Sequence, residues 1–189
     1  MSNPLSGITF PDDATRPAVP EITGAAQPGA HGSMHLRMIH DHHRQNMAII
    51  DKLIERAAAG TITPDEATAQ AEALPLNENY RRFGALCGQY CQFVHTHHTI
   101  EDAHMFPAVS AKTQAWNKVI DRLQAEHEIV HELLVRLIGA INTLAQTNAP
   151  TDFANARILY ETLEKLLSSH FKYEENSIGP ALDHFGIAI

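Results

Sequence analysis

Four long segments of this chain carry apolar residues at alternating steps of three and four, and this spacing constrains the fold more than any other feature. On an α-helix, the spacing gathers side chains into one stripe, which must be buried against other helices. We therefore predict helices over about 33–59, 79–106, 113–146 and 152–177. Because short links join the last three, the expected fold is all-α, an up-down-up-down antiparallel four-helix bundle.

The chain divides into an arm and a bundle. Residues 1–32 are rich in Pro, Gly, Ala and Thr and show no apolar period, so we interpret them as an extended or mobile N-terminal arm. Residues 33–189 are expected to form the four-helix domain. The 189 residues suit one ordinary domain, and the apolar share of 44% is enough for a core.

Charge and hydropathy exclude several classes of partner. The net charge of −8 argues against nucleic acid, because phosphate binding requires a basic face. No run approaches the roughly 20 apolar residues that span a bilayer, and the first 21 residues do not resemble a secretory signal. We therefore expect a cytoplasmic protein with no membrane partner. Cys87 and Cys91 are interpreted as reduced, partly buried thiols, with a redox pair as the alternative.

The chain has 13 histidines, and each predicted helix carries histidine on its apolar stripe. In an antiparallel bundle, His40 and His127, early in the first and third helices, lie near the level of His97 and His170, late in the second and fourth. A buried imidazole without a partner costs free energy, and a shared metal ion would satisfy all four. The stripe therefore predicts one metal site inside the bundle.

Acidic residues follow the histidines at helical spacing. Side chains at positions i and i+4 stack on one face of a helix, so both can reach the same metal centre. Imidazole and carboxylate ligands together suit iron, manganese or zinc, and two carboxylates able to bridge favour a pair of iron ions over one structural zinc. The pairs with this spacing are His97 with Glu101, His127 with His131, and His170 with Glu174.

An internal repeat supports the same site. The stretches HHTIEDAHMFPAV (97–109) and HFKYEENSIGPAL (170–182) align without a gap. Both read His, three residues, two acids, four residues, and Pro-Ala followed by a branched aliphatic residue. The second and fourth predicted helices therefore look like two copies of one half-site, which a bundle of two helical hairpins can combine.

These residues resemble the hemerythrin-like, or HHE cation-binding, family over about residues 34–185. The diagnostic pattern H-x3-E-[DE]-x3-[LF]-P is met at His97, Glu101, Asp102, Phe106 and Pro107. The pattern recurs at His170, Glu174, Glu175 and Pro180, except that the residue before this proline is neither Leu nor Phe. One histidine in each of the other two predicted helices completes the family pattern.

The resemblance implies a non-haem di-iron centre, with manganese or zinc as alternative metals. Glu101 and Glu174 resemble the bridging carboxylates, although Glu175 has the spacing found in the oxygen carriers. His43 is an additional stripe histidine, while His42, His95 and His98 are expected to face solvent or a neighbouring helix. The histidines that resemble terminal ligands are His40, His97, His127, His131 and His170.

The resemblance implies a protein that binds or senses O2 or related small oxidants such as NO and peroxide, without an assigned catalytic residue. The alternatives are a di-iron peroxidase or oxidase, and a protein that stores iron or repairs iron centres. The arm and the connector at 60–78 exceed a minimal domain of this family. We consider two roles for them, covering the site or forming a homodimer contact.

Overall fold

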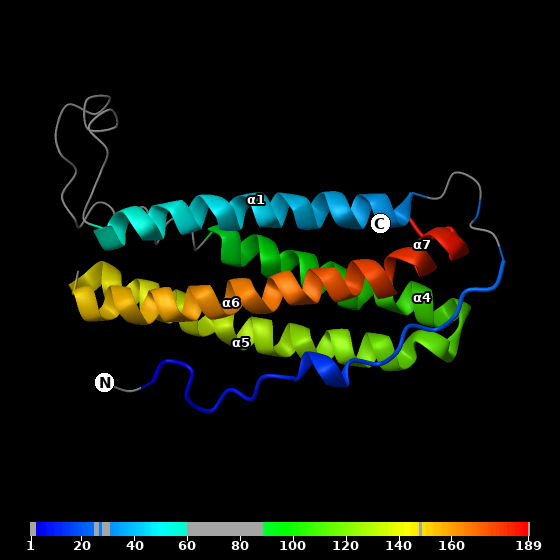
Figure 1. Ribbon diagram of the computed structural model, residues 1–189, viewed down its shortest axis with the longest axis horizontal. Helices are drawn as coiled ribbons and strands as arrows, with labels where there is room; N and C mark the ends of the chain where they lie inside the picture. Colours follow the sequence, from blue (N-terminus) through cyan, green and yellow to red (C-terminus); the bar gives the residue numbers. More distant parts are fainter. Residues whose placement is uncertain (1–2, 25–26, 28–30, 60–88, 148, 189) are drawn as a thin grey trace, which may run out of the picture.

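The structure is a computed structural model that describes residues 3–24, 27, 31–59, 89–147 and 149–188. Among these residues it contains helices and no strand, which confirms the all-α prediction. Four long helical stretches lie side by side in Figure 1. They are α1 (Gly32–Ala59), the stretch 89–112, α5 (Asn117–Thr147) and α6 (Pro150–Ser177).

The directions of these stretches follow from Figure 1, in which α1 and α5 run from the right of the view to the left. The stretch 89–112 and α6 run in the opposite direction. The start of the second predicted helix, the connector at 60–78 and Cys87 lie outside the described residues. None of the described helices is long and apolar enough to cross a membrane.

Two helices begin at other residues than predicted, one because of a proline and the other because of a side-chain cap. α6 begins at Pro150, two residues before the predicted start, because proline is favoured in the first turn of a helix. A 3-10 turn at Gln114–Trp116 precedes α5. The hydroxyl of Thr113 accepts a hydrogen bond from the backbone N–H of Ala115 and caps this turn.

The stretch 89–112 is not one regular helix. Residues 89–100 are α-helical, Glu101–Met105 form a π-helical turn, and α4 (Phe106–Lys112) continues beyond it. The N–H of Phe106 donates to the carbonyl of Glu101, five residues earlier, and the next residue is Pro107. Because proline has no N–H and its ring crowds the preceding turn, the wider π turn accommodates it within the helix.

The second copy of the repeat meets its proline differently. α6 ends at Ser177, as predicted, and Ile178 separates it from the short helix α7 (Gly179–Phe185), which carries Pro180 in its first turn. Gly186, with a φ of 63°, ends α7 in the left-handed conformation that favours glycine. Both copies of the sequence repeat therefore interrupt the regular α-helix after the histidine-acid pair, the first by a π turn and the second by a break at Ile178.

Two apolar clusters form the core, one on either side of the buried histidines. Both clusters contain large side chains that are completely buried. The burial of apolar surface is the main driving force for the association of helices. The larger cluster includes Met47, Val94, Val130, Leu167 and Phe171. The smaller includes Leu36, Met105, Trp116, Leu123 and Ile178. α1, the stretch 89–112 and α5 each contribute buried residues to both clusters, and their buried histidines lie between the two contributions in the sequence.

The N-terminal residues 3–24 run as an extended trace along α5 and α6 (Figure 1). Leu5 and Ile8 pack against the larger apolar cluster, and Ile22 packs against the smaller one. Arg136 on α5 donates to the carbonyl of Pro4 at 3.0 Å. The described residues 3–24 of the arm therefore lie against the bundle.

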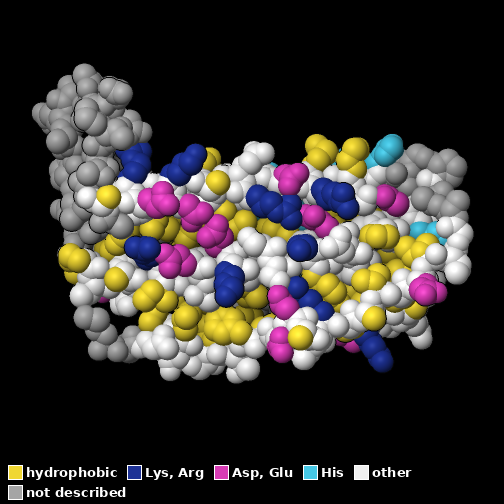
Figure 2. Space-filling view, in the orientation of Figure 1, with side chains coloured by type: hydrophobic (Ala, Val, Ile, Leu, Met, Phe, Trp, Pro, Cys, Tyr) yellow, Lys and Arg dark blue, Asp and Glu magenta, His cyan; other side chains and the backbone are white. Residues whose placement is uncertain are grey.

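Figure 2 shows the face formed mainly by α1 and α6. Acidic and basic side chains alternate on it, and histidine atoms are sparse. The chain has 13 histidines, and six of those described are buried among the helices.

Candidate metal centre

Seven buried side chains meet between the two apolar clusters and divide into two groups. Within each group, the nitrogen or oxygen atoms that can bind a metal lie within 4.8 Å of one another. The four-residue group consists of His40, His97, Glu101 and Glu174. The three-histidine group consists of His98, His127 and His170. All seven side chains are at most 8% exposed.

Each of the two carboxylates contacts both groups. Glu101 Oε1 lies 3.2 Å from His97 Nε2, and its Oε2 lies 3.7 Å from His127 Nε2. Glu174 Oε2 lies 3.3 Å from His40 Nε2 and 3.7 Å from His170 Nε2. A carboxylate that reaches histidines of two groups has the placement required to bridge two cations.

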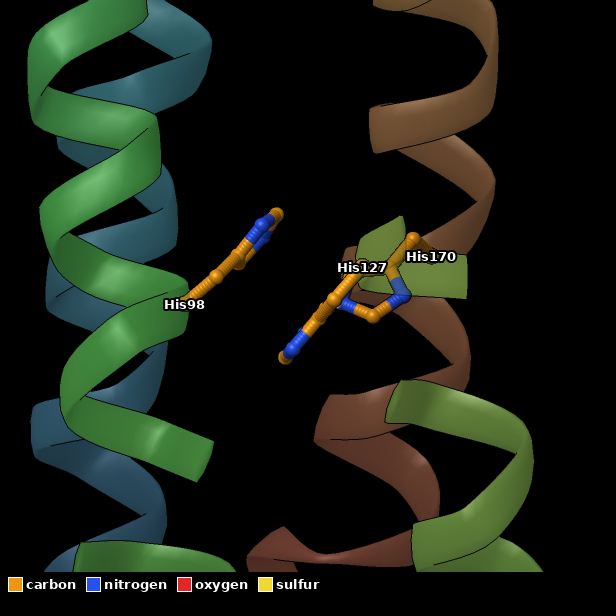
Figure 3. A group of neighbouring side chains, drawn as sticks. All are labelled: His98, His127 and His170. Atoms are coloured by element: carbon orange, nitrogen blue, oxygen red, sulfur yellow. Dashed lines mark hydrogen bonds between the residues drawn. The ribbon is translucent and has the colours of Figure 1, made fainter. Parts of the chain in front are cut away.

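The three-histidine group draws on three different helices (Figure 3). His98 extends from the 89–100 helix, His127 from α5 and His170 from α6, toward the space between them. The rings of His98 and His127 stack with centroids 3.9 Å apart. His127 Nε2 lies 3.1 Å from His170 Nε2. Two nitrogens each about 2.1 Å from one cation and at a right angle to it are about 3 Å apart, so this spacing suits a shared ion.

Outer carboxylates fix the orientation of three imidazoles. A metal-bound histidine usually donates its second N–H to a carboxylate or carbonyl, which leaves the lone pair of the other nitrogen for the metal. In each case here the partner lies at Nδ1 and Nε2 points inward. The pairs are His40 with Glu175 at 2.9 Å, His127 with Asp102 at 3.1 Å and His170 with Glu126 at 2.9 Å.

Hydrogen bonding within the described protein does not satisfy the centre of the cluster. All four oxygens of Glu101 and Glu174 are buried without a hydrogen-bond partner, and so is His98 Nε2. His40 Nε2 lies 3.1 Å from His97 Nε2, so a proton or a metal ion must lie between these two acceptors. Buried acceptors and carboxylates without partners are costly, and cations would satisfy them together. The donor set therefore fits metal binding.

Burial favours the neutral forms of these side chains, which is the state that a metal requires of histidine, whereas Glu101 must release a proton to bind one. Burial lowers the pKa of His97 and His98 well below the ordinary value, and neighbouring histidines lower it further. Burial, followed by the charge of Glu174, raises the pKa of Glu101 well above its usual range. Burial lowers the pKa of His170 as well, although Glu126 opposes the shift. Neutral imidazoles can coordinate a cation without first releasing a proton.

The arm reaches this centre through Arg16. Its guanidinium donates to both carboxylate oxygens of Glu126, each at 3.0 Å, and to the hydroxyl of Ser169 at 2.9 Å. Arg122 donates to Glu126 as well, at 2.7 Å. Burial alone would raise the pKa of Glu126, but hydrogen bonds from His170, Arg16 and Arg122 outweigh it and lower the pKa to about 2. Glu126 is therefore held ionised beside His170.

The structure brings six of the seven predicted ligands together: His40, His97, Glu101, His127, His170 and Glu174. It does not bring His131 into either group. His131 is exposed, and Val130 and Leu134 occupy the inner face of α5 at its level. α5 is rotated about its axis so that His131 lies at the edge of its inner face, where its ring is beside that of His95.

His98 was expected to face solvent or a neighbouring helix, and the expectation of solvent exposure is wrong, because the residue is 5% exposed. A stripe wider than about 100° admits two adjacent residues, so His97 and His98 both point inward. The adjacent pair of histidines was the available signal in the sequence. Glu175 lies outside both groups as the partner of His40.

The additional histidine of α1, His43, is buried but belongs to neither group. Its ring centroid lies 5.0 Å from that of His97 and 5.9 Å from that of Tyr90. Burial, with smaller contributions from His40 and His42, lowers its pKa to about 4. His43 is therefore a neutral neighbour of the four-residue group.

Comparison with known proteins bears on the same residues. The family profile described as Hemerythrin HHE cation binding domain matches residues 31–182, which include all seven members of the cluster. No curated protein and no solved structure matches the chain.

Proposed function

Since this chain belongs to the hemerythrin HHE cation-binding family, we propose that its buried cluster holds two iron ions and binds O2 or a related small oxidant. The observation that carries the proposal is the pair of buried carboxylates, Glu101 and Glu174, each in contact with histidines of both groups. One structural cation would not require two carboxylates placed in this way.

The proposed ligand set differs in one residue from the set that the sequence suggested. His40 and His97 would hold one ion, and His98 would take the place proposed for His131 in holding the other with His127 and His170. Glu101 and Glu174, which contact both groups, would offer carboxylate oxygens to both ions. Iron accepts mixed imidazole and carboxylate ligands.

Ferrous ions would supply the electrons for binding O2, and the protein would supply the environment. Phe171 stacks on His40 with centroids 4.2 Å apart, and Phe106 stacks on His127 at 5.6 Å. These apolar walls limit the entry of water beside the cations. Glu175, Asp102 and Glu126 hold the outer imidazole protons, so the ligand nitrogens keep their lone pairs inward.

Reversibility tests the proposed function. Protein loaded anaerobically with ferrous iron is mixed with O2 and then purged with argon, while absorbance and free iron are followed. We expect a new absorption that appears with O2 and disappears on purging, with iron retained. Irreversible oxidation with turnover of peroxide or a reductant would instead identify a di-iron peroxidase or oxidase. Iron that leaves for an added acceptor would identify an iron-handling protein.

A matched control separates the cluster from adventitious iron. The variant His97→Ala/Glu101→Ala removes one ligand from an ion and one bridging carboxylate. The absorption change should be lost in this variant and retained in Arg157→Ala, whose side chain forms an exposed ion pair on α6. An O2-dependent absorption that survives in the double variant would contradict the proposed site.

A further inference from the structure

A cavity of about 300 Å³ lies between the 89–112 stretch and α5. Two of its lining residues, His98 and His127, are buried members of the three-histidine group. Two others, His95 and His131, are exposed. The cavity therefore connects the outside of the bundle with the candidate metal ligands, and a pair of histidines lies at its mouth.

The two mouth histidines come from different helices and face each other. Their ring centroids are 5.2 Å apart, with the ring planes inclined at 39°. When two imidazoles bind one ion at a nitrogen distance of about 2.1 Å and a tetrahedral angle, their centroids lie about 5 Å apart. His95 and His131 are thus spaced to hold one cation between them.

Acidic residues surround the same opening. Glu128 lies one turn before His131 on α5 and is exposed, while the side chain of Asp102 is 38% exposed. Both line the cavity, together with the hydroxyl residue Thr99. No lysine or arginine lines it among the described residues. Carboxylates around a concave opening raise the local concentration of cations.

We propose that His95 and His131 form an outer cation-binding site, which captures a divalent metal ion and delivers it through the cavity to His98 and His127. This inference rests on the metal centre proposed above. It accounts for His131, which carries the spacing of a ligand yet lies outside the inner cluster. A buried metal site also requires a path of entry, and this cavity reaches two members of the inner cluster.

The rate of metal uptake tests the outer site. The full chain, stripped with a chelator, is mixed with limiting cobalt(II) in a stopped-flow instrument, and the visible absorption of bound cobalt is recorded. For His95→Ala/His131→Ala we expect uptake to slow on the order of tenfold. The final cobalt content per chain should equal that of the unmodified protein, because the inner ligands remain.

The control variant is His31→Ala/His104→Ala, which removes two exposed histidines outside the cavity lining. It should take up cobalt at the unmodified rate. Equal rates in all three proteins would overturn the outer site while leaving the metal centre intact. If the unmodified protein itself bound no cobalt or iron, the metal centre would fail, and the outer site with it.

Discussion

Arg16 of the N-terminal arm donates two hydrogen bonds to Glu126 on α5, each 3.0 Å long, across 110 residues of sequence. The second oxygen of that carboxylate accepts from His170 Nδ1 at 2.9 Å. The arm is therefore joined to a candidate metal ligand through a single side chain. Glu126 is fully buried and the Arg16 side chain is 12% exposed, so solvent screens the pair weakly.

Substitution Arg16→Ala should destabilise the protein and weaken its metal binding. Losing charge-assisted hydrogen bonds to a buried carboxylate should lower the free energy of unfolding by about 1.5–3 kcal/mol. Glu126, the outer partner of His170, would remain but lose one of its two arginine partners, so iron binding should weaken by no more than about 10-fold. Urea denaturation and competition with a chelator measure the two effects.

The control for this substitution is Arg157→Ala, which breaks an ion pair whose side chains are 47% and 51% exposed. It should change stability by less than about 1 kcal/mol. If Arg16→Ala and Arg157→Ala behaved alike in both measurements, the arm would have no connection to the centre.

A separate prediction concerns which histidine, His98 or His131, binds a metal ion together with His127 and His170. His98→Ala should reduce the iron content after reconstitution, because it removes a buried ligand of the three-histidine group. His131→Ala should leave the final content unchanged, because the side chain is exposed and lies outside the group. Metal analysis of the two purified variants gives the answer, and the opposite ranking would restore the ligand set suggested by the sequence.

Most of the fold, and the gathering of six of the seven predicted ligands in one buried cluster, could be predicted from the sequence, because helical periodicity and the histidine-acid spacing are local properties. The burial of His98 and the exposure of His131 could not, since they depend on how each helix is rotated about its axis. A rotation of about 100° replaces one residue by its neighbour on the inner face. Periodicity alone defines that rotation poorly when the buried stripe is wide.

The contacts between the N-terminal arm and the bundle could not be predicted from the sequence for another reason. Residues 1–32 have no periodic pattern, so nothing in the sequence indicates that Arg16 would pair with Glu126. Ion pairs between distant segments depend on the tertiary arrangement. Likewise, the π turn at Glu101–Met105 depends on how the chain accommodates Pro107 within a packed helix, whereas the corresponding Pro180 follows a break.

Glu101→Gln should have opposite effects on stability with and without metal. The raised pKa of Glu101 means that its ionised form is disfavoured in the folded protein, so the contribution to stability falls as pH rises above 4.5. At pH 7 the metal-stripped variant should therefore be more stable than the unmodified protein, by about 1 kcal/mol or more. With iron at 100 times the dissociation constant, the unmodified protein gains about 2.7 kcal/mol per site, and the order should reverse.

Thermal unfolding with and without chelator measures this reversal. The same order of stability under both conditions would show that Glu101 is not a metal ligand.

Glu164 on α6 predicts a pH dependence away from the centre. Burial raises the pKa of Glu164 from 4.5 to about 7, and a hydrogen bond with Asp51 and the negative charge of Asp51 contribute to the shift. Because the folded-state pKa is the higher one, stability falls as pH rises between about 4.5 and 7 and stays reduced above that range. Glu164→Gln removes the ionisation, so at pH 8 it should be more stable than the unmodified protein.

We expect a gain of about 1 kcal/mol after solvent screening, which corresponds to about 2–4 °C in Tm. The gain should vanish below pH 4.5, where both proteins carry a neutral side chain at this position. A difference in Tm that is equal at pH 4 and pH 8 would argue against titration of Glu164 as its cause.

The most direct test of the metal centre is the iron content per folded chain after anaerobic reconstitution and removal of loosely bound metal. We predict about two iron ions per chain, and a marked loss in His97→Ala/Glu101→Ala, because metal affinity requires its ligands in place. Absence of bound iron, or an unchanged iron content in the double variant, would contradict the assignment of the buried histidine and glutamate cluster as a di-iron site.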